Sequence, residues 1–417
     1  MNPIPAPEPS SRDVARRRFL KGGVVLGAAL AAGATRSAVG QPASDDPSRV
    51  VGGPMRPYGD RSRFEEAVKQ KGPPSMPDEW GGNFTPLGET LGIITPSALH
   101  YEVCRGGVPD IDPRKHRLMI HGMVDRPLIL TIEEIRRLPS TSRILFLECS
   151  GNTRGEWRAP SAPTVQFTHG ITSCSEWTGV MLALLLREAG VQKGATWILA
   201  EGADATGNER SIPLAKAMDD VLVAYGQNGE PPRPGNGYPL RLIVPGWEGN
   251  VNVKWLRRIK VVDRPYMTRM ESPDHTSLMP DGKARQFMFV MEAKSVITFP
   301  SGGQRLPGPG FHEITGLAWS GRGLVRRAEV STNGGKTWRD ARLEAPVLRF
   351  AHTRFRLDWW WDGREAVLQS RCTDETGYVQ PTRGELVKVR GLNSIYHNNA
   401  IQSWKVAADG NVQNVHA

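Results

Sequence analysis

The order of apolar and polar residues predicts a mixed domain between residues 91 and 290. Residues 117–124 alternate between the two kinds, as a half-buried strand requires. Thr131 and the acidic residues after it predict the start of a short helix, and residues 180–189 predict an apolar helix that ends at Gly190. Because strands and helices follow no regular alternation, we expect an α+β or irregular α/β domain rather than a doubly wound sheet.

After about residue 296 the pattern becomes purely β. Short alternating segments separated by turn residues at this spacing are typical of an immunoglobulin-like sandwich. The segments lie at residues 314–319, 325–331, 338–343, 354–361 and 366–373. We therefore predict an α+β fold in which a mixed domain at 91–290 is followed by an all-β sandwich at 291–410.

The N-terminus predicts an export signal. Three consecutive arginines at 16–18 precede an uncharged run at 22–35, which is too short and too weakly apolar for a lasting membrane span. We interpret residues 1–40 as a twin-arginine signal peptide, which would deliver the folded protein to the periplasm and leave no membrane span after its removal. Residues 41–90, rich in proline, glycine and charge, predict an extended lead-in.

Composition and charge narrow the class of protein. A chain of 417 residues suits two domains. The net charge of +10 falls to +6 without residues 1–40, which hold six basic and two acidic residues. No stretch interleaves basic and aromatic residues, so we expect no nucleic-acid partner. The four cysteines show no CxxC spacing, which argues against a zinc motif or a dense disulfide framework.

The strongest candidate for chemistry follows the apolar run at residues 144–147. Cys149 ends this predicted strand and precedes turn-forming residues, so its thiol should lie at the strand end. Arg143 and Arg154 would favour the thiolate, which is the form that binds soft transition metals. The alternative is a small cysteine buried in the core.

A second stretch, residues 236–250, places a cation inside an apolar strand. Arg241 interrupts that strand, so its guanidinium needs either a bound anion or a carboxylate. Lys254, just beyond a Gly-Asn turn, could join the same anion. Upstream, Gly106 and Gly107 allow the backbone to approach a bulky ligand closely.

One segment resembles that of a known enzyme family. Residues 148–154, Glu-Cys-Ser-Gly-Asn-Thr-Arg, resemble the molybdenum-ligating segment of the sulfite oxidase family, and residues 91 to about 406 are similar to its SoxC branch. The resemblance implies a sulfite-oxidase-type molybdopterin domain with one Mo-molybdopterin per chain and Cys149 as the metal ligand. It also implies six further cofactor-binding residues, which are Val103, Cys104, Arg105, Asn236, Arg241 and Lys254.

The same resemblance implies catalytic residues and shows two departures. Arg154 matches a basic residue of the family's anionic substrate pocket. Where the family has an arginine this chain has Val103, so either Arg105 substitutes for it or the pocket has lost one positive charge. Where the family has a tyrosine this chain has His275, which donates a hydrogen bond as tyrosine does but titrates near neutral pH. Altered substrate, an altered pH profile or reduced activity would follow.

Other polar residues near these segments are expected to serve structure. Glu148, Glu156 and Arg158 are interpreted as structural or solvated. His169 and Cys174 lie in sequence that resembles pocket-lining segments of the SoxC branch, but a core histidine and a buried thiol are the favoured interpretations.

These observations predict a periplasmic molybdenum oxidoreductase that oxidises a sulfur oxyanion such as sulfite, or a protein-bound sulfane. The sequence has no CxxCH haem site, so electrons would leave through a separate carrier. The resemblance implies a c-type cytochrome subunit for that role and a homodimer formed through the sandwich. Residues 359–361, three tryptophans, could belong to the dimer interface, although aromatic residues in a strand are as often core.

Two other functions remain open at this point. One is a molybdenum sulfoxide reductase, although relatives of that kind lack a C-terminal sandwich. The other is a non-catalytic SoxC-like subunit that binds a sulfur compound or scaffolds a complex, which the departures at Val103 and His275 keep open. Metal analysis and reduction of a cytochrome by sulfite would separate these functions.

Overall fold

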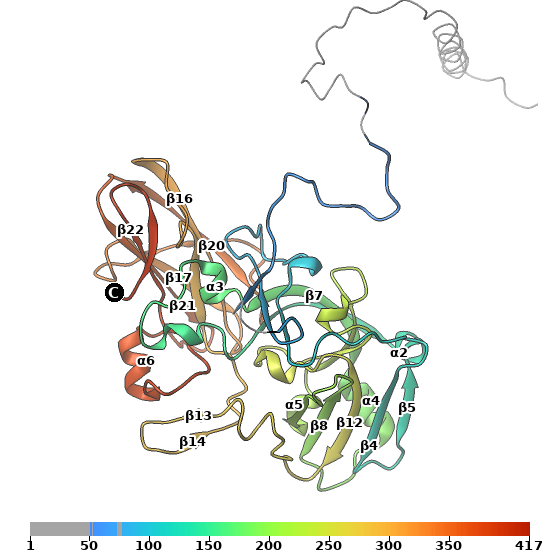
Figure 1. The fold of residues 1–417 in the computed structure, drawn as a ribbon. Helices are drawn as coiled ribbons and strands as arrows, with labels where there is room; N and C mark the ends of the chain where they lie inside the picture. Colours follow the sequence, from blue (N-terminus) through green and yellow to red (C-terminus); the bar gives the residue numbers. More distant parts are fainter. Residues whose placement is uncertain (1–50, 52, 73–76) are drawn as a thin grey trace, which may run out of the picture. The chain divides into compact units, whose positions relative to one another are not determined.

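The computed structural model describes residues 51, 53–72 and 77–417 (Figure 1). The chain divides after Glu65 into two compact units, and the second unit holds every helix and strand described below. The predicted signal peptide at 1–40 lies outside the described residues. Within the described ranges, no helix is both long and apolar enough to cross a membrane.

Two sheets build the mixed domain. In the first, with strand order β11-β10-β7-β6, all neighbours are antiparallel. Its strands are β6 (Ser140–Glu148), β7 (Thr172–Met181), β10 (Leu222–Gln227) and β11 (Arg241–Ile243). In the second, with order β5-β4-β12-β8-β9, β12 runs parallel to β4 and the other pairs are antiparallel. Its strands are β4 (Arg117–Gly122), β5 (Leu128–Thr131), β8 (Trp197–Gly202), β9 (Glu209–Pro213) and β12 (Leu256–Val262).

Short helices connect these strands. They are α2 (Ile132–Arg136), α3 (Val165–His169), α4 (Leu182–Ala189), α5 (Leu214–Ala217) and the 3-10 helices η2 (Ser97–Leu99), η3 (Arg154–Trp157), η4 (Pro234–Asn236) and η5 (Gly249–Val251). Thr131 caps α2 as predicted, because its side chain accepts from the Glu134 backbone N–H while the Glu134 carboxylate accepts from Thr131 N–H. Helix α4 ends at Gly190 as predicted, but it begins later than expected because Val180 and Met181 still pair with β10.

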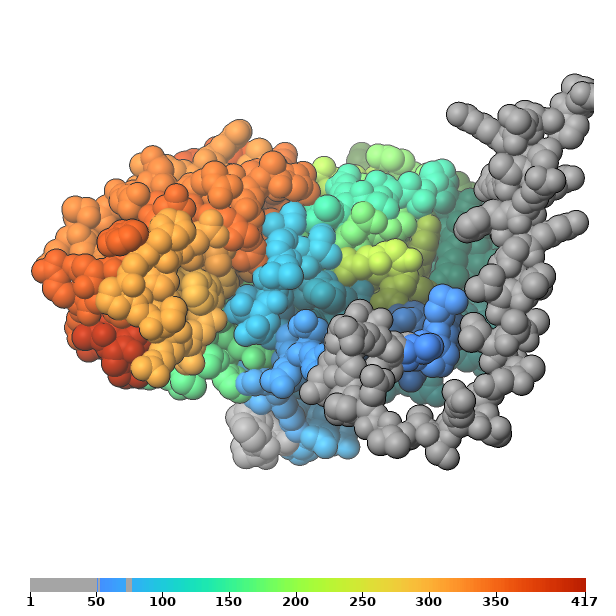
Figure 2. Space-filling view, turned by 90° about the horizontal axis from the view of Figure 1, so that it is seen from above, coloured from blue at the N-terminus to red at the C-terminus, as the bar shows by residue number. Residues whose placement is uncertain are grey.

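The lead-in and the segment that follows it form a small third sheet. Strands β1 (Gln70–Gly72), β2 (Gly81–Phe84) and β3 (Glu102–Cys104) pair antiparallel in that order. Residues near position 90, light blue in Figure 2, lie between the orange sandwich and the green mixed domain. Arg354 of the sandwich donates to the carbonyl oxygens of Thr90 (3.0 Å) and Gly92 (2.8 Å), so this segment is attached to the sandwich.

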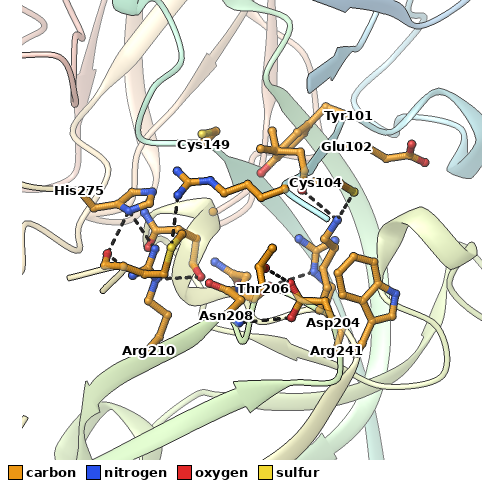
Figure 3. A pocket seen from close by; sticks show the side chains of 18 residues that line it. Tyr101, Glu102, Cys104, Cys149, Asp204, Thr206, Asn208, Arg210, Arg241 and His275 are labelled. Carbon is orange, nitrogen blue, oxygen red and sulfur yellow. Dashed lines mark hydrogen bonds between the residues drawn. The ribbon is translucent and has the colours of Figure 1, made fainter. Parts of the chain in front are cut away.

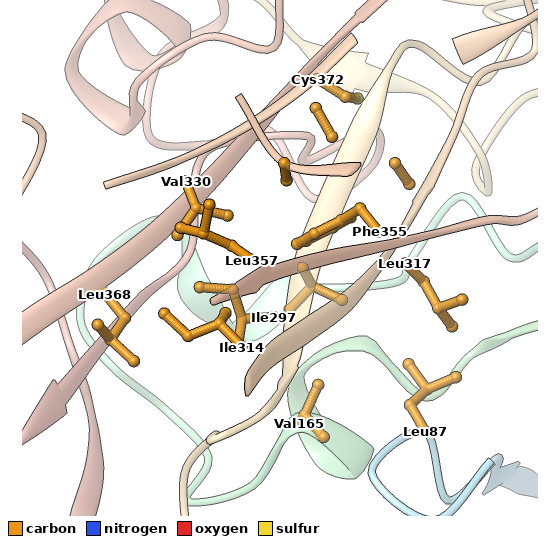
Figure 4. Packing of buried hydrophobic residues seen from close by; sticks show 14 of the residues in the cluster. Leu87, Val165, Ile297, Ile314, Leu317, Val330, Phe355, Leu357, Leu368 and Cys372 are labelled. Atoms are coloured by element: carbon orange, nitrogen blue, oxygen red, sulfur yellow. The ribbon is translucent and has the colours of Figure 1, made fainter. Parts of the chain in front are cut away.

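The C-terminal part is a sandwich of two sheets, as the alternating pattern predicts. The first sheet has the order β15-β16-β20-β19 and the second β18-β17-β21-β22-β23. Their strands are β15 (Lys294–Phe299), β16 (Gly310–Trp319), β17 (Val325–Ser331), β18 (Arg339–Asp340), β19 (Arg342–Leu343), β20 (Thr353–Trp361), β21 (Ala366–Asp374), β22 (Ser403–Val406) and β23 (Val412–Val415). Side chains of both sheets share one apolar core (Figure 4), which includes Ile297, Ile314, Val330, Phe355 and Leu368.

Besides the C-terminal strands β22 and β23, two elements in or next to the sandwich were not predicted. One is the hairpin β13 (Ser277–Leu278) and β14 (Ala284–Arg285), and the other is helix α6 (Arg383–Arg390). The sequence did carry a signal for α6, because Thr382 and Glu385 form a capping box at its start. Such short strands as β13 and β14 carry no comparable signal.

The side chains of the three tryptophans at 359–361 point alternately to the two faces of β20. Trp359 and Trp361 point into the core, whereas Trp360 is 74% exposed. Across the sheet Trp360 pairs with Phe311, which is also exposed. The predicted interface role is therefore open only to Trp360 and its neighbour, and the other two tryptophans serve the core.

A buried ion pair joins the sandwich to the mixed domain. The Lys294 ammonium donates to Glu148 Oε1 (2.8 Å) and to Thr153 Oγ1 (3.0 Å). Trp319 Nε1 donates to Glu148 Oε2 (2.6 Å), and Asn152 Nδ2 donates to Oε1 (2.9 Å). Glu148 and Lys294 are fully buried. Glu148 thus has a structural role, as expected, at the residue that precedes Cys149.

Replacing Lys294 by methionine should destabilise the protein strongly. The substitution leaves the Glu148 carboxylate buried without a cation, and breaking such a pair costs about 3 to 5 kcal/mol. Denaturant unfolding of Lys294→Met measures this loss. The same change at the exposed Lys388 of α6 serves as the control and should alter the free energy of unfolding by less than about 0.5 kcal/mol. Equal losses in the two variants would contradict a stabilising role for the pair.

Candidate active site

A cavity lies between strands β3, β6, β9 and β11. The loop between β8 and β9 and the segments before and after β12 complete its wall. Its empty volume is about 770 Å³, open solvent at its mouth included. Figure 3 shows the side chains that line it. The lining is rich in cations and contains two thiols, Cys104 and Cys149.

The cavity brings together most of the residues selected from the sequence. Those that line it are Val103, Cys104, Arg105, Cys149, Arg241, Lys254 and His275. Asn236 lies behind the wall, where its carbonyl oxygen accepts from Arg241 Nη1 (2.9 Å). Arg154 does not line the cavity, because it begins the turn of η3 with its side chain exposed. Its charge still acts on Cys149.

Cys149 lies at the end of β6 and faces the cavity, as predicted. Its backbone is fixed by a bond from Cys149 N–H to the Ile171 carbonyl oxygen (3.0 Å). Gly249 packs directly against it, since a Cβ at position 249 would lie 3.2 Å from Cys149 Cα and 2.5 Å from the Tyr101 hydroxyl oxygen. Glycine is therefore required where η5 approaches the thiol.

The expectation that nearby arginines alone favour the Cys149 thiolate needs correction. Burial raises the pKa of the thiol and outweighs the opposing effects of the Gly151 backbone N–H and of Arg105 and Arg154. Arg143 is exposed and lines a different surface hollow. A thiolate at this position therefore needs a stronger cation beside it, which a metal ion supplies.

Arg241 and Lys254 define one end of the cavity, which we call the lysine end. The Lys254 ammonium donates to the carbonyl oxygens of Val103 and Gly235 (both 3.0 Å) and contacts Cys104 Sγ (3.1 Å). Arg241 donates to the Asn252 carbonyl oxygen (3.3 Å) and lies over the Trp177 ring. Within the described part of the chain, neither cation has a carboxylate within 4.0 Å. The sequence allowed either a carboxylate or a bound anion as the partner of Arg241. Since no carboxylate is near, the bound anion remains.

Burial opposes both of these charges. It lowers the pKa of Arg241 to about 10, and it lowers the pKa of Lys254 as well. Buried cations without carboxylate partners are costly unless an anion binds between them. The lysine end is therefore suited to a phosphate or another multiply charged anion.

The opposite end, which we call the thiol end, contains Cys149, Arg210 and His275 (Figure 3). Arg105 lines this end as well. Arg105 forms an ion pair with Asp274 (2.7 Å). Arg210 is the second residue of β9, is 2% exposed, and donates to the carbonyl oxygens of Met270 and Asn250. Arg210 was not predicted, although a cation two residues before the buried Ile212, on the same face of a strand, was an available signal.

Arg210 also fixes the state of His275. His275 Nδ1 lies 2.9 Å from Arg210 Nη2 and 3.1 Å from the Met270 carbonyl oxygen, so this nitrogen faces both a donor and an acceptor. Burial and the Arg210 charge lower the pKa of His275 to about 3. The expectation that His275 titrates near neutral pH is therefore wrong. Its ring stacks on Tyr396 with centroids 5.2 Å apart.

Several lining residues had no sequence signal. They come from the β8–β9 loop and from the segments around Gly249 and Met270, and they are Asp204, Thr206, Asn208, Asn250, Asn252, Trp255 and Met270. Single polar residues in loops do not form a pattern, and only the fold brings them together. His169 and Cys174 are buried and do not line this cavity, in agreement with the core interpretation.

A segment beyond the sandwich helix α6 supports the cavity from behind. We call residues 394–399 the C-terminal strap. His397 N–H donates to the Ser150 carbonyl oxygen (2.8 Å), and Thr153 Oγ1 donates to the Asn398 carbonyl oxygen (2.6 Å). The strap therefore holds the turn that follows Cys149.

The His397 imidazole is enclosed by carboxylates. Its Nε2 and Nδ1 lie 3.2 Å from Glu248 and Glu292, and Arg390 pairs with Glu292 at 2.6 Å. The two carboxylates raise the pKa of His397 to about 9 in spite of its burial. The ring is therefore an imidazolium at neutral pH, and it connects Glu248, next to Gly249, with the sandwich side.

Comparison with known proteins gives two family models that match this chain. Residues 105–270 match the oxidoreductase molybdopterin binding domain, and residues 285–404 match the Mo-co oxidoreductase dimerisation domain. Among curated proteins, mitochondrial sulfite oxidase of Mus musculus is 31% identical over 340 residues and that of Drosophila melanogaster 34% identical over 339 residues. These matches cover 75% and 73% of this chain. They cover 62% and 58% of the relatives, so the chain spans about three-fifths of their length.

A solved structure is similar over nearly the whole chain. The crystal structure of the sulfane dehydrogenase SoxCD from Paracoccus pantotrophus superposes with a TM-score of 0.87 and 45% sequence identity, covering 89% of this chain and 96% of that chain. The likeness includes the mixed domain and the sandwich. The predicted fold class is thereby confirmed.

The charged His397 makes stability depend on pH in a defined direction. Its raised pKa stabilises the folded state below pH 6.5, and this contribution is lost as the pH rises through about 9. We expect the difference in free energy of unfolding between wild type and His397→Gln to be on the order of 3 kcal/mol near pH 6 and to shrink toward pH 9.5. Denaturant unfolding over this range measures it. A difference that stays constant would show that His397 is not charged.

Proposed function

Since the chain belongs to the sulfite oxidase family of molybdopterin oxidoreductases, we propose that it is a molybdenum enzyme that oxidises an anionic sulfur compound. The substrate is either sulfite or a sulfane sulfur held on a protein. Similarity to sulfite oxidases supports the first, and 45% identity to a sulfane dehydrogenase supports the second. The observation that carries the proposal is one cavity that joins the Cys149 thiol to two separate groups of cations.

The cavity residues fit a molybdopterin. Cys149 offers one sulfur ligand, and no cluster of three or more His, Cys, Asp or Glu side chains in the described ranges is arranged to hold a metal by itself. This donor set suits a metal that brings its other sulfur ligands with it. At the lysine end, Arg241 and Lys254 have the charge that a pterin phosphate requires. When bound, the molybdenum centre would supply two-electron oxygen transfer to sulfur.

The residues at the thiol end bind and orient the substrate. Arg105 and Arg210 offer N–H donors to a sulfur oxyanion, and the neutral His275 ring lies beside them. These donors are held by Asp274, Met270 and Asn250 before any ligand arrives, so little reorganisation is needed. The chain therefore contributes position and charge neutralisation, and it has no need of a titrating base at His275.

We extend the proposal to location and partners. The arginines at 16–18 and the uncharged run after them support export in folded form to the periplasm. Since the sequence has no CxxCH site, a c-type cytochrome is proposed as the electron acceptor. The match to a dimerisation domain supports a homodimer through the sandwich. The presence of that domain gives a sulfoxide reductase less support.

Metal content and turnover test the proposed function together. The purified protein should contain one molybdenum per chain and reduce an added c-type cytochrome when given sulfite. In Cys149→Ser, turnover should fall at least about 100-fold, because a ligand is removed and loss of an outer partner alone costs 10- to 100-fold. Cys372→Ala, at a thiol buried in the sandwich, should keep its metal.

The outcomes separate the candidate functions. Folded wild type without molybdenum would support the non-catalytic scaffold. Molybdenum without turnover of sulfite would leave sulfane or sulfoxide chemistry, and protein-bound sulfane and a sulfoxide are then the substrates to compare.

A further inference from the structure

Arg210 is the cation at the thiol end whose charge has no nearby partner. Among the described residues no carboxylate oxygen lies within 4.0 Å of its guanidinium, whereas Arg105 beside it is paired with Asp274 at 2.7 Å. Its three recorded hydrogen bonds go to two carbonyl oxygens and to His275 Nδ1. A guanidinium has five N–H donors, so two are left over.

The carboxylates at longer range are engaged elsewhere. Glu248, Glu271 and Asp274 all act on the charge of Arg210. Glu248 is bound to His397, Glu271 accepts from Ser211 N–H and Oγ–H, and Asp274 holds Arg105. The neighbours of Arg210 thus orient it without neutralising it.

Burial without a carboxylate is not sufficient evidence, and Arg354 shows why. Arg354 is 3% exposed, and its guanidinium donates to the carbonyl oxygens of Thr90 and Gly92 and to Thr315 Oγ1. It lines none of the cavities near Cys149 and serves to attach the lead-in. Arg210 differs because it lines the same cavity as the Cys149 thiol (Figure 3). The two unused N–H donors of Arg210 are therefore available to a ligand in that cavity.

We propose that Arg210 determines substrate specificity by binding the negatively charged oxygen of a sulfur oxyanion at the thiol end. The same guanidinium contacts His275 Nδ1 at 2.9 Å, so the His275 ring lies at the same end of the cavity as the proposed anion. The site then selects anions over neutral sulfur compounds such as sulfoxides, because a neutral ligand leaves the buried charge uncompensated. This chain has Val103 where the family has an arginine, and Arg210 of β9 supplies a positive charge instead.

This inference rests on the proposed function, and sulfite and sulfate serve as probes. In Arg210→Gln holoenzyme, the KM for sulfite should rise about 10- to 100-fold, the usual effect of losing a hydrogen bond from a charged group. The inhibition constant of sulfate should rise by a similar factor, while kcat stays within about threefold. Arg187→Gln, on the exposed side of α4, is the matched control and should change none of these values.

A second readout does not depend on turnover. Sulfate should raise the melting temperature of wild-type holoenzyme, and the concentration for half of this shift should be about 10-fold higher in Arg210→Gln. Should that variant fail to fold or to keep molybdenum, Arg210→Lys replaces it. Lysine keeps the charge but loses the planar fork, so both constants should rise by a smaller factor of about 3 to 10.

The results distinguish this inference from the proposed function. Wild type that oxidises neither sulfite nor protein-bound sulfane overturns the function, and the sulfate melting shift still tests Arg210. Active wild type with unchanged KM and unchanged sulfate constants in Arg210→Gln overturns the inference alone. A loss of kcat with unchanged KM also overturns it, since Arg210 would then support structure or chemistry rather than selection.

Discussion

The buried contact between Glu148 and Lys294 holds the thiol in place. The two carboxylate oxygens of Glu148 accept from Lys294 and Trp319 of the sandwich, and Cys149 is the next residue in the chain. Removing a carboxylate and an ammonium from water is costly, so the pair persists only with both members and their hydrogen bonds present. This requirement makes the end of β6, and with it the thiol, dependent on the second domain.

The sandwich therefore does more than its match to a dimerisation domain implies. The C-terminal strap fixes the turn after Cys149 through His397 and Asn398, and Tyr396 stacks on His275. These contacts come from residues that lie more than 200 positions after the thiol in the chain. Preorganised donors work only if their supports are rigid, and here much of that support comes from outside the mixed domain.

Positive charge is the second organising feature of the site. Arg210 and Arg241 are buried and Lys254 is half-buried, and burial lowers the pKa of each. This burial is costly, and anions bound at the two ends of the cavity would offset the cost. Separate cation groups at the lysine end and at the thiol end thus allow a cofactor phosphate and a small sulfur oxyanion to be held in one cavity.

The sequence by itself determined the features that depend on local pattern. The alternation after residue 296 predicted the sandwich strands, the cap at Thr131 predicted α2, and the apolar run before Cys149 placed its thiol at a strand end. A cation within an apolar strand made Arg241 visible in the same way. The period of side chains and the chemistry of turns extend over a few residues, so they can be read without the fold.

Only the tertiary structure decided which charges face one another. Arg210 meets His275 across 65 residues and keeps it neutral, η3 turns Arg154 toward solvent, and His397 joins Glu248 to Glu292. The protonation state of a buried group depends on burial and on neighbours that are distant in the chain. For this reason the sequence identified the Cys149 thiol, whereas the fold determined its electrostatic surroundings.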